Sequence, residues 1–264
     1  MLRFCSALFA AFVVVFPGVA LAASGGAFCA LSNPFALVDT LGGVPSACTV
    51  ARGAVSIDAD YLQNASRVGG TALAAYPLVR LRSGITKRLD VEIDVPSQIA
   101  ESRAGGGGLY PMTRFGYGLG YSLVASSASA IALLAQVLPP TSRFAPTQTQ
   151  SKYAVGLTSS FTVAPRLTLG VLAGGTSSGT VGFQRVLPSL AVNGGYAASN
   201  NTQFSVDLGS RISSRRSVAQ SFGDASINQR LRRNLLFSVG VGTSFNPVGN
   251  AKSHYLASGF NVRI

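Results

Sequence analysis

The stretch Asn234–Phe245 (NLLFSVGVGTSF) decides the fold class, because its side chains alternate in character one by one. The odd positions carry Leu235, Phe237, Val239 and Val241, while the even positions include Ser238, Gly240 and Gly242. A period of two puts successive side chains on opposite faces of an extended chain. The stretch is therefore predicted to be a β-strand with one apolar and one polar face.

The same alternation recurs along the chain, for example in Lys152–Val163 and Thr202–Ile212. It marks twelve candidate strands, near residues 51–62, 71–84, 88–96, 111–124, 129–138, 152–163, 167–175, 186–198, 202–212, 224–231, 234–245 and 254–264. Short connections near 85–87, 126–128, 164–166, 199–201 and 232–233 alternate with longer ones near 63–70, 97–110, 139–151, 176–185, 213–223 and 246–253. Segments of about ten alternating residues, joined in this way, are the signature of a transmembrane β-barrel.

The pattern predicts an all-β protein, a transmembrane antiparallel β-barrel of about twelve strands over residues 51–264, with ten and fourteen strands as the neighbouring counts. Both ends of such a barrel lie at the short-turn, periplasmic side. A secreted β-sandwich also alternates and is the competing interpretation. The polar parity is rich in glycine and serine, which favours the barrel because it leaves room for a wet interior.

Composition agrees with a membrane protein. Of the 264 residues, 47% are apolar and 11% charged, against roughly 25% charged in ordinary soluble domains. Seven of the nine carboxylates fall in candidate strands, all on the polar parity: Asp58, Asp60, Asp90, Glu92, Asp94, Asp207 and Asp224. The 21 Lys and Arg residues give a formal net charge of +12. They are spread over both ends of the strands, so nucleic acid is not an expected partner.

The first residues have the pattern of an export signal. Arg3 precedes the apolar run Leu8–Val15, and Ala20–Ala22 supplies the small residues of a cleavage site. We expect cleavage after Ala22 or Ala23, so that residues 1–23 form a signal peptide. The alternative is an uncleaved anchor helix, but the run is shorter than the roughly 20 residues needed to span a bilayer.

Residues 24–50 form a periplasmic segment before the barrel. It holds Cys29 and Cys48, an even pair in an oxidising compartment, so we expect a disulfide between them. A zinc site is a poor fit, because no histidine lies near this pair. Two roles stay open for the segment: it plugs the bore from the periplasmic side, or it docks on a partner.

The segment Tyr76–Pro96 (YPLVRLRSGITKRLDVEIDVP), followed by Gly118–Gly120 (GLG) and Leu133–Pro139 (LLAQVLP), resembles a known family. These are the outer-membrane β-barrel transporters of the phenol meta-cleavage-pathway (MetA-pathway) type, and the resemblance covers roughly residues 70–264. It implies a porin-like channel for small molecules and brings no catalytic residues. The chain departs from the family in the disulfide-bearing segment. It also ends on Ile264, where outer-membrane barrels usually end on an aromatic, although its last strand otherwise resembles the signal that the barrel-assembly machinery recognises.

Charged residues of the polar parity are the candidate lining of the lumen. If one hairpin folds about Thr86, Arg82 faces Asp90 and Arg80 faces Glu92 across the strands. Such a set forms either a charged constriction or a structural ladder that fills a narrow barrel. The candidate constriction residues are Arg80, Arg82, Asp90, Glu92, Asp94, Arg114, Asp207 and Arg211. With Arg52, Lys152, Arg230, Arg263, Asp58, Asp60 and Asp224, the inward parity holds eight basic and seven acidic groups, which predicts weak ion selectivity.

The remaining positive charge lies mostly in the longer, outer loops. These carry Arg67, Arg103, Arg143, Arg185, Arg215, Arg216 and Lys252, with Glu101 as the single acid. Lipopolysaccharide carries phosphates, which suit the planar fork of arginine. We therefore expect contacts with lipopolysaccharide head groups, with generic solvated loops as the simpler alternative.

The sequence predicts a channel in the outer membrane of a Gram-negative bacterium that passes small solutes by diffusion; the permeant stays unknown. No cofactor or metal is expected, and no enzyme. The competing functions are a closed structural or adhesive barrel and, next, a barrel enzyme that acts on lipid. The enzyme would need His254, the one histidine, which has no Asp or Glu beside it in sequence.

Overall fold

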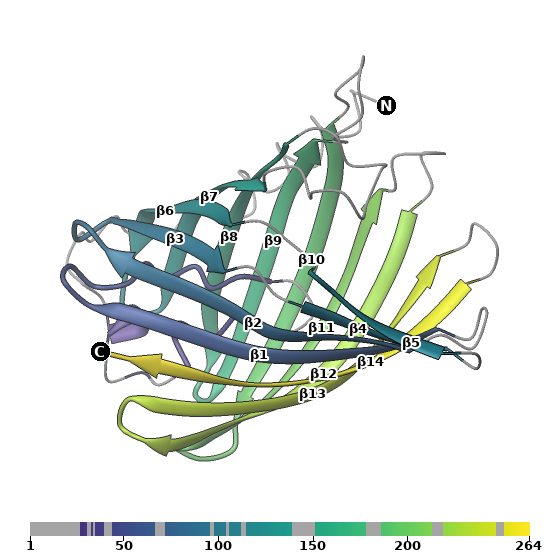
Figure 1. Ribbon diagram of the computed structural model, residues 1–264. Coiled ribbons are helices and arrows are strands. Elements are labelled where there is room, and N and C mark those ends of the chain that lie inside the picture. Colours follow the sequence, from purple (N-terminus) through teal and green to yellow (C-terminus); the bar gives the residue numbers. More distant parts are fainter. Residues whose placement is uncertain are drawn as a thin grey trace.

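The barrel predicted from the alternation is present in the structure, a computed structural model (Figure 1). It describes residues 27–30, 33, 35–39, 44–66, 72–95, 98–103, 106–111, 115–138, 151–177, 186–212, 219–246 and 251–264. One antiparallel sheet of fourteen strands closes on itself, because β1 pairs with both β14 and β2.

The strands follow the predicted order. They are β1 (Val55–Ser66), β2 (Ala72–Gly84), β3 (Leu89–Val95), β4 (Gln98–Arg103), β5 (Gly106–Pro111), β6 (Gly116–Ala125), β7 (Ser129–Leu138), β8 (Lys152–Ala164), β9 (Leu167–Ser177), β10 (Val186–Ala197), β11 (Thr202–Ile212), β12 (Ala219–Arg232), β13 (Leu235–Asn246) and β14 (Ala251–Arg263).

The fourteen strands occupy twelve positions around the barrel wall. We call each position a stave, whether one strand or two strands end to end fill it. The first half of β2 pairs with β4 and its second half with β3, so β3 and β4 form one interrupted stave. β5 pairs with β4 and β6 with β3, which makes β5 and β6 a second interrupted stave. Twelve antiparallel staves confirm the predicted fold and strand number. Among the described residues, β7 pairs with β6 and not with β5.

The expectation of a long loop over 97–110 is wrong, since β4 and β5 occupy most of it. β4 pairs with Ala72–Tyr76 of β2, and this tertiary partner overrides the loop-like composition of Gly105–Gly108. The other outer ends are also more extended than predicted: β1 runs to Ser66 and β12 begins at Ala219.

The short turns lie at one end of the barrel, together with the C terminus and η1 (Ala27–Cys29), a 3-10 turn (Figure 1). The turn after β2 shows a shift from the predicted register. Gly84 lies opposite Asp90, Arg82 opposite Glu92 and Arg80 opposite Asp94. The predicted direct oppositions of Arg82 with Asp90 and of Arg80 with Glu92 are therefore wrong. The hairpin is centred on Lys87 rather than Thr86. A shift of one residue at the turn moves the partners by two and keeps every side chain on its face.

The two faces of the barrel differ as the alternation predicts. On β6 the outward residues Tyr117, Leu119 and Tyr121 are between 42% and 53% exposed, while Gly120 and Ser122, which have the opposite parity, are buried. Aromatic residues of this outer face lie near both strand ends: Tyr196, Phe204 and Phe260 at the turn end, and Tyr117, Tyr153 and Phe245 at the loop end. An apolar band between aromatic girdles is the lipid-facing surface of a membrane barrel.

No helix in the described ranges is long and apolar enough to cross a bilayer.

The compact apolar core belongs to residues 24–50, called the N-terminal segment below. Cys29 and Cys48 form the expected disulfide, with Cα atoms 5.4 Å apart. The buried apolar residues around it are Phe28, Ala36, Leu37, Ala47, Cys48 and Val50, which pack against Ala130 of β7. The segment therefore lies against the barrel wall inside the turn end of the molecule.

Candidate functional site: the lumen and the N-terminal segment

The inner face can be followed around the barrel from Arg82, which bonds to the N-terminal segment. Residues that lie directly opposite each other on neighbouring strands point to the same face of the sheet. The strand register therefore identifies the inward-facing residues of each stave in turn, starting from β2. The seven carboxylates of the predicted strands lie on the inner face: Asp58, Asp60, Asp90, Glu92, Asp94, Asp207 and Asp224. So do many small residues of β8, β9 and β10, such as Gly156, Gly174 and Ser189. The lumen is thus lined mostly by short side chains, with charges gathered on particular staves.

A charged cluster on β2 and β3 receives the N-terminal segment. Nη1 of Arg80 lies 2.6 Å from Oδ2 of Asp39, and Nε of Arg80 lies 3.2 Å from Glu92 and 2.9 Å from Asp94. Gln136 of β7 donates to the same carboxylate of Asp94 at 2.6 Å. Arg80 is thus surrounded by three acids from the wall and the segment.

Arg82 forms the most deeply buried pair of the cluster. Its Nη2 atom lies 2.9 Å from Oδ2 of Asp90 and also donates to the backbone carbonyl of Cys48 at 3.0 Å. The same Asp90 oxygen accepts the backbone N–H of Val50 at 2.9 Å. The side chains of Arg82 and Asp90 are only 4% and 1% exposed. Gly120 of β6 provides the space, because a Cβ atom there would overlap Oδ1 of Asp90.

The N-terminal segment also contacts other walls. The Thr158 hydroxyl of β8 donates to the carbonyl of Pro45 at 2.7 Å. Nη1 of Arg263, on β14, donates to the carbonyl of Asn33 at 3.1 Å. Beside Gly170 of β9, an added Cβ would lie 3.4 Å from Val44. The segment thus bridges the lumen from β2 and β3 to β8, β9 and β14.

Asp39 connects the segment to both arginines. Burial opposes its charged form, but Arg82 and Arg80, together with the backbone N–H of Ser46, hold the pKa of the Asp39 carboxyl below its ordinary value. Asp39 is therefore an anion in the docked segment. Sequence reasoning did not select it, although a signal existed: it is the one charged residue in 24–50.

A cavity of about 690 Å³ lies beside this contact. Its lining includes Asp39 and Pro45 from the segment, Arg80 and Glu92 from the charged cluster, and Lys152 and Arg211 from β8 and β11. It is therefore a space in the lumen that carries charges on two different walls.

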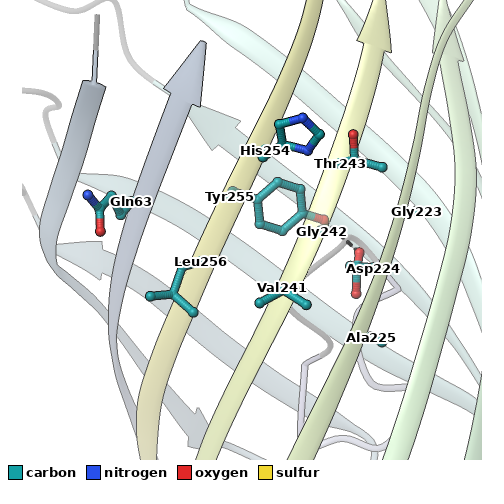
Figure 2. Close-up of a pocket in the computed structure, with 10 residues that line it drawn as sticks. All are labelled: Gln63, Gly223, Asp224, Ala225, Val241, Gly242, Thr243, His254, Tyr255 and Leu256. Carbon is teal, nitrogen blue, oxygen red and sulfur yellow. Dashed lines mark hydrogen bonds between the residues drawn. The ribbon is translucent and has the colours of Figure 1, made fainter. Parts of the chain in front are cut away.

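A second polar cluster lies on β10, β11, β12 and β14, and Figure 2 shows its contact between Tyr255 and Asp224. Asp207 and Asp224 are direct partners on the inner face, and the Tyr255 hydroxyl donates to Oδ2 of Asp224 at 2.7 Å. Asn193 donates to Oδ1 of Asp207 at 3.2 Å. Gly242 accommodates the ring of Tyr255, because a Cβ there would overlap it.

His254 precedes Tyr255 and so lies on the outer face, paired with Thr243 and Ala65. It borders a hollow of about 610 Å³ together with Gln63, Val241 and Leu256 (Figure 2). Asp224 belongs to the opposite face of the sheet. Asp224 also lines the hollow, but its carboxylate is bonded to Tyr255. Among the described residues, His254 therefore has no carboxylate partner of the kind that a catalytic base uses.

The structure brings together five of the predicted constriction residues, Arg80, Arg82, Asp90, Glu92 and Asp94, and places Asp207 and Arg211 across the lumen on β11. Arg114 lies outside the described residues. Among the predicted outer-loop residues, Lys252 is exposed on β14 and Arg103 ends β4. Arg67, Arg143, Arg185, Arg215 and Arg216 lie outside the described residues.

Comparison with models of known sequence families gives no match, and neither does comparison with curated proteins. Solved structures do match. The COG4313 outer membrane channel from Pseudomonas putida F1 aligns with a TM-score of 0.59 at 13% identity, over 86% of this chain and 100% of that one. The KdgM porin in complex with disordered oligogalacturonate gives 0.53 at 12% identity, over 78% and 98% of the two chains.

The fold is that of porin-like outer-membrane channels. The NanC porin supports this with a TM-score of 0.51 at 8% identity, over 77% of this chain and 98% of that one. The porin-like barrel implied by the resemblance in Tyr76–Pro96 is therefore confirmed at the level of fold.

Proposed function

We propose that the protein is an outer-membrane channel that passes small solutes by diffusion, with the N-terminal segment narrowing the path at its periplasmic end. The observation that carries this proposal is the cavity of about 690 Å³ beside Asp39, inside a closed barrel whose lumen is lined mostly by short side chains. A barrel filled by bulky interior side chains would offer no such space.

The charge balance of the lumen supports weak ion selectivity. To the eight basic and seven acidic groups of the inward parity, the segment adds Asp39, which gives eight of each. Fixed charges of both signs in similar number favour neither cations nor anions strongly. We propose that the reversal potential in a salt gradient stays close to zero.

The proposal also covers export of the chain, its insertion into the outer membrane and its contacts with lipopolysaccharide. Residues 1–23 would be removed on export, and the barrel-assembly machinery would insert the chain into the outer membrane. The exposed Lys252 and the arginines of the outer loops would contact phosphates of lipopolysaccharide. No catalytic role is proposed for any residue.

Conductance across a planar lipid bilayer tests the proposal, with protein purified from the outer membrane of an expressing Gram-negative host. We expect stepwise openings in KCl and a reversal potential near zero at two salt gradients. Silence from protein that is shown to be folded would contradict the channel and support the closed structural barrel. The extensive contacts of the N-terminal segment with Arg80, Arg82 and Thr158 favour that second function.

A further inference from the structure

The charges that line the cavity differ in how they are engaged. Among its acids, Asp39 is bonded to Arg80 and to the backbone N–H of Ser46, and Glu92 lies 3.2 Å from Arg80 and 3.3 Å from Gln136. A cation that entered would have to compete with these existing partners. The acids of this wall are therefore already engaged by donor groups of the protein itself.

The two basic residues on the facing staves, Lys152 and Arg211, differ from these acids because protein groups of the described residues do not already engage them. Lys152 opens β8 and Arg211 lies near the end of β11, both on the inner face. Neither makes an ion pair or side-chain hydrogen bond in the described part of the chain, and Arg211 is exposed to the lumen. An entering anion would meet two cations without displacing a protein carboxylate.

The same cavity has an apolar strip. Leu134, Leu172, Leu187 and Phe222 belong to the inner face of β7, β9, β10 and β12 and line the cavity. Glycines open the space between them: a Cβ at Gly156 would lie 3.0 Å from Leu172, and a Cβ at Gly174 would lie 2.7 Å from the carbonyl of Val155. An apolar body would lose its hydration shell there, while its charged end reached Lys152 or Arg211.

We propose that this cavity is a binding site for small organic anions with an apolar body, held by Lys152 and Arg211 against the strip Leu134, Leu172, Leu187 and Phe222. The inference deepens the proposed channel function by assigning a class of permeant. It is compatible with weak selectivity for small ions, because the overall charge of the lumen sets that selectivity, whereas local contacts set the binding of an organic anion.

Three probes of nearly equal shape test the site: benzoate, benzyl alcohol and benzylammonium, with charges of −1, 0 and +1. Each is added to single channels of the full protein in KCl, and the block of the current is measured. We expect benzoate to block at concentrations about tenfold lower than benzyl alcohol, and benzylammonium to be the weakest. Acetate, which keeps the charge and lacks the apolar body, should also block weakly.

The double variant Lys152→Gln, Arg211→Gln should raise the half-blocking concentration of benzoate at least about tenfold, because neither position can then donate a charge-assisted hydrogen bond to its carboxylate. Its block by benzyl alcohol should not change. The matched control is Lys87→Gln, Arg88→Gln, which removes the same charge from an exposed turn and should leave benzoate block as in the wild type.

The outcomes separate the site from the channel. Equal block by the three probes in a conducting protein, or benzoate block unchanged in the double variant, would overturn the site and leave the channel intact. If the protein does not conduct, calorimetric titration with benzoate decides: binding that the double variant loses supports the site without the channel, and no binding overturns it.

Discussion

At the scale of single residues, Arg82 is the side chain on which docking of the N-terminal segment depends most. Its guanidinium neutralises Asp90 and holds the carbonyl of Cys48 in a buried place. Arg82→Met leaves Asp90 charged and without its cation, which should cost about 3–5 kcal/mol. The free energy of unfolding, followed in detergent by the gel-mobility difference between folded and unfolded barrel, measures this loss.

Two variants bracket that prediction. Arg82→Met combined with Asp90→Asn should recover much of the stability, because no uncompensated charge stays buried. Arg88→Met removes an arginine from the exposed turn and should change little. If Arg88→Met lowered the free energy of unfolding as much as Arg82→Met, the buried pair of Arg82 and Asp90 would not stabilise the protein more than an exposed arginine does.

Asp39 predicts the pH dependence of docking. Because the arginines lower the pKa of Asp39 in the folded protein, its contribution is complete above the ordinary carboxyl pKa of about 3.9 and is lost as pH falls through the lowered pKa. The contribution of Asp39 therefore keeps the conductance of the wild type constant from pH 7 to about pH 4.5. In stronger acid the carboxyl loses its charge, the contact with the arginines weakens, and the conductance should rise.

Asp39→Asn isolates the contribution of this carboxyl. The variant should conduct more than the wild type already at pH 7, and its further rise in acid should be smaller, because one titrating contact is gone. Identical conductance of the two proteins across the whole pH range would mean that Asp39 does not hold the segment.

Gly120 predicts a steric effect on the buried pair. In Gly120→Ala the new Cβ overlaps Oδ1 of Asp90, and the packed surroundings leave that carboxylate little room to move. Overpacking of this kind costs roughly 1–3 kcal/mol. Gly194→Ala is the control, since no atom of the described residues lies within 4 Å of its added Cβ. Equal stability of the two variants, measured by the same gel assay, would contradict the prediction.

At the scale of elements, the disulfide keeps the N-terminal segment compact. Cys29 and Cys48 close a loop with a sequence separation of 19, and closure of a loop of about this length is worth roughly 3 kcal/mol. Replacement of both cysteines by serine should make Phe28 and Leu37 accessible to chymotrypsin, because the looser segment leaves the lumen more often. Wild type treated with a thiol reductant should be cleaved at the same sites, while cleavage as slow as in untreated wild type would argue that the barrel contacts alone fix the segment.

At the scale of the whole molecule, the barrel closes without the segment, since β1 pairs with β14 along Ser56–Ser66. A chain without residues 24–50 should therefore still insert and should show a larger single-channel conductance. Unchanged conductance would remove the plug and leave docking on a partner as the role of the segment. Failure to insert would show instead that the segment is needed to assemble the barrel.

Part of this site was predictable from residue type and parity. Arg80, Arg82, Asp90, Glu92 and Asp94 share one parity around a short turn, so their gathering on one face follows from the pleat alone. The predicted partners do form ion pairs, Arg82 with Asp90 and Arg80 with Glu92, but as diagonal neighbours, because the turn is centred one residue later than predicted. The contact of Arg80 with Asp94, its direct partner, was not predicted. The role of Asp39 depends on contacts across some forty residues, which no local pattern encodes.

The sequence by itself determined the barrel, its twelve staves, the outward apolar band and the inward charges, because alternation with period two fixes the face of every strand residue locally. Only the tertiary structure decided that β4 and β5 extend two staves, that the segment around Cys29 and Cys48 lies inside the barrel, and that Lys152 and Arg211 share a cavity. These facts depend on which distant surfaces meet when the sheet closes, and closure brings together residues that are far apart in the chain.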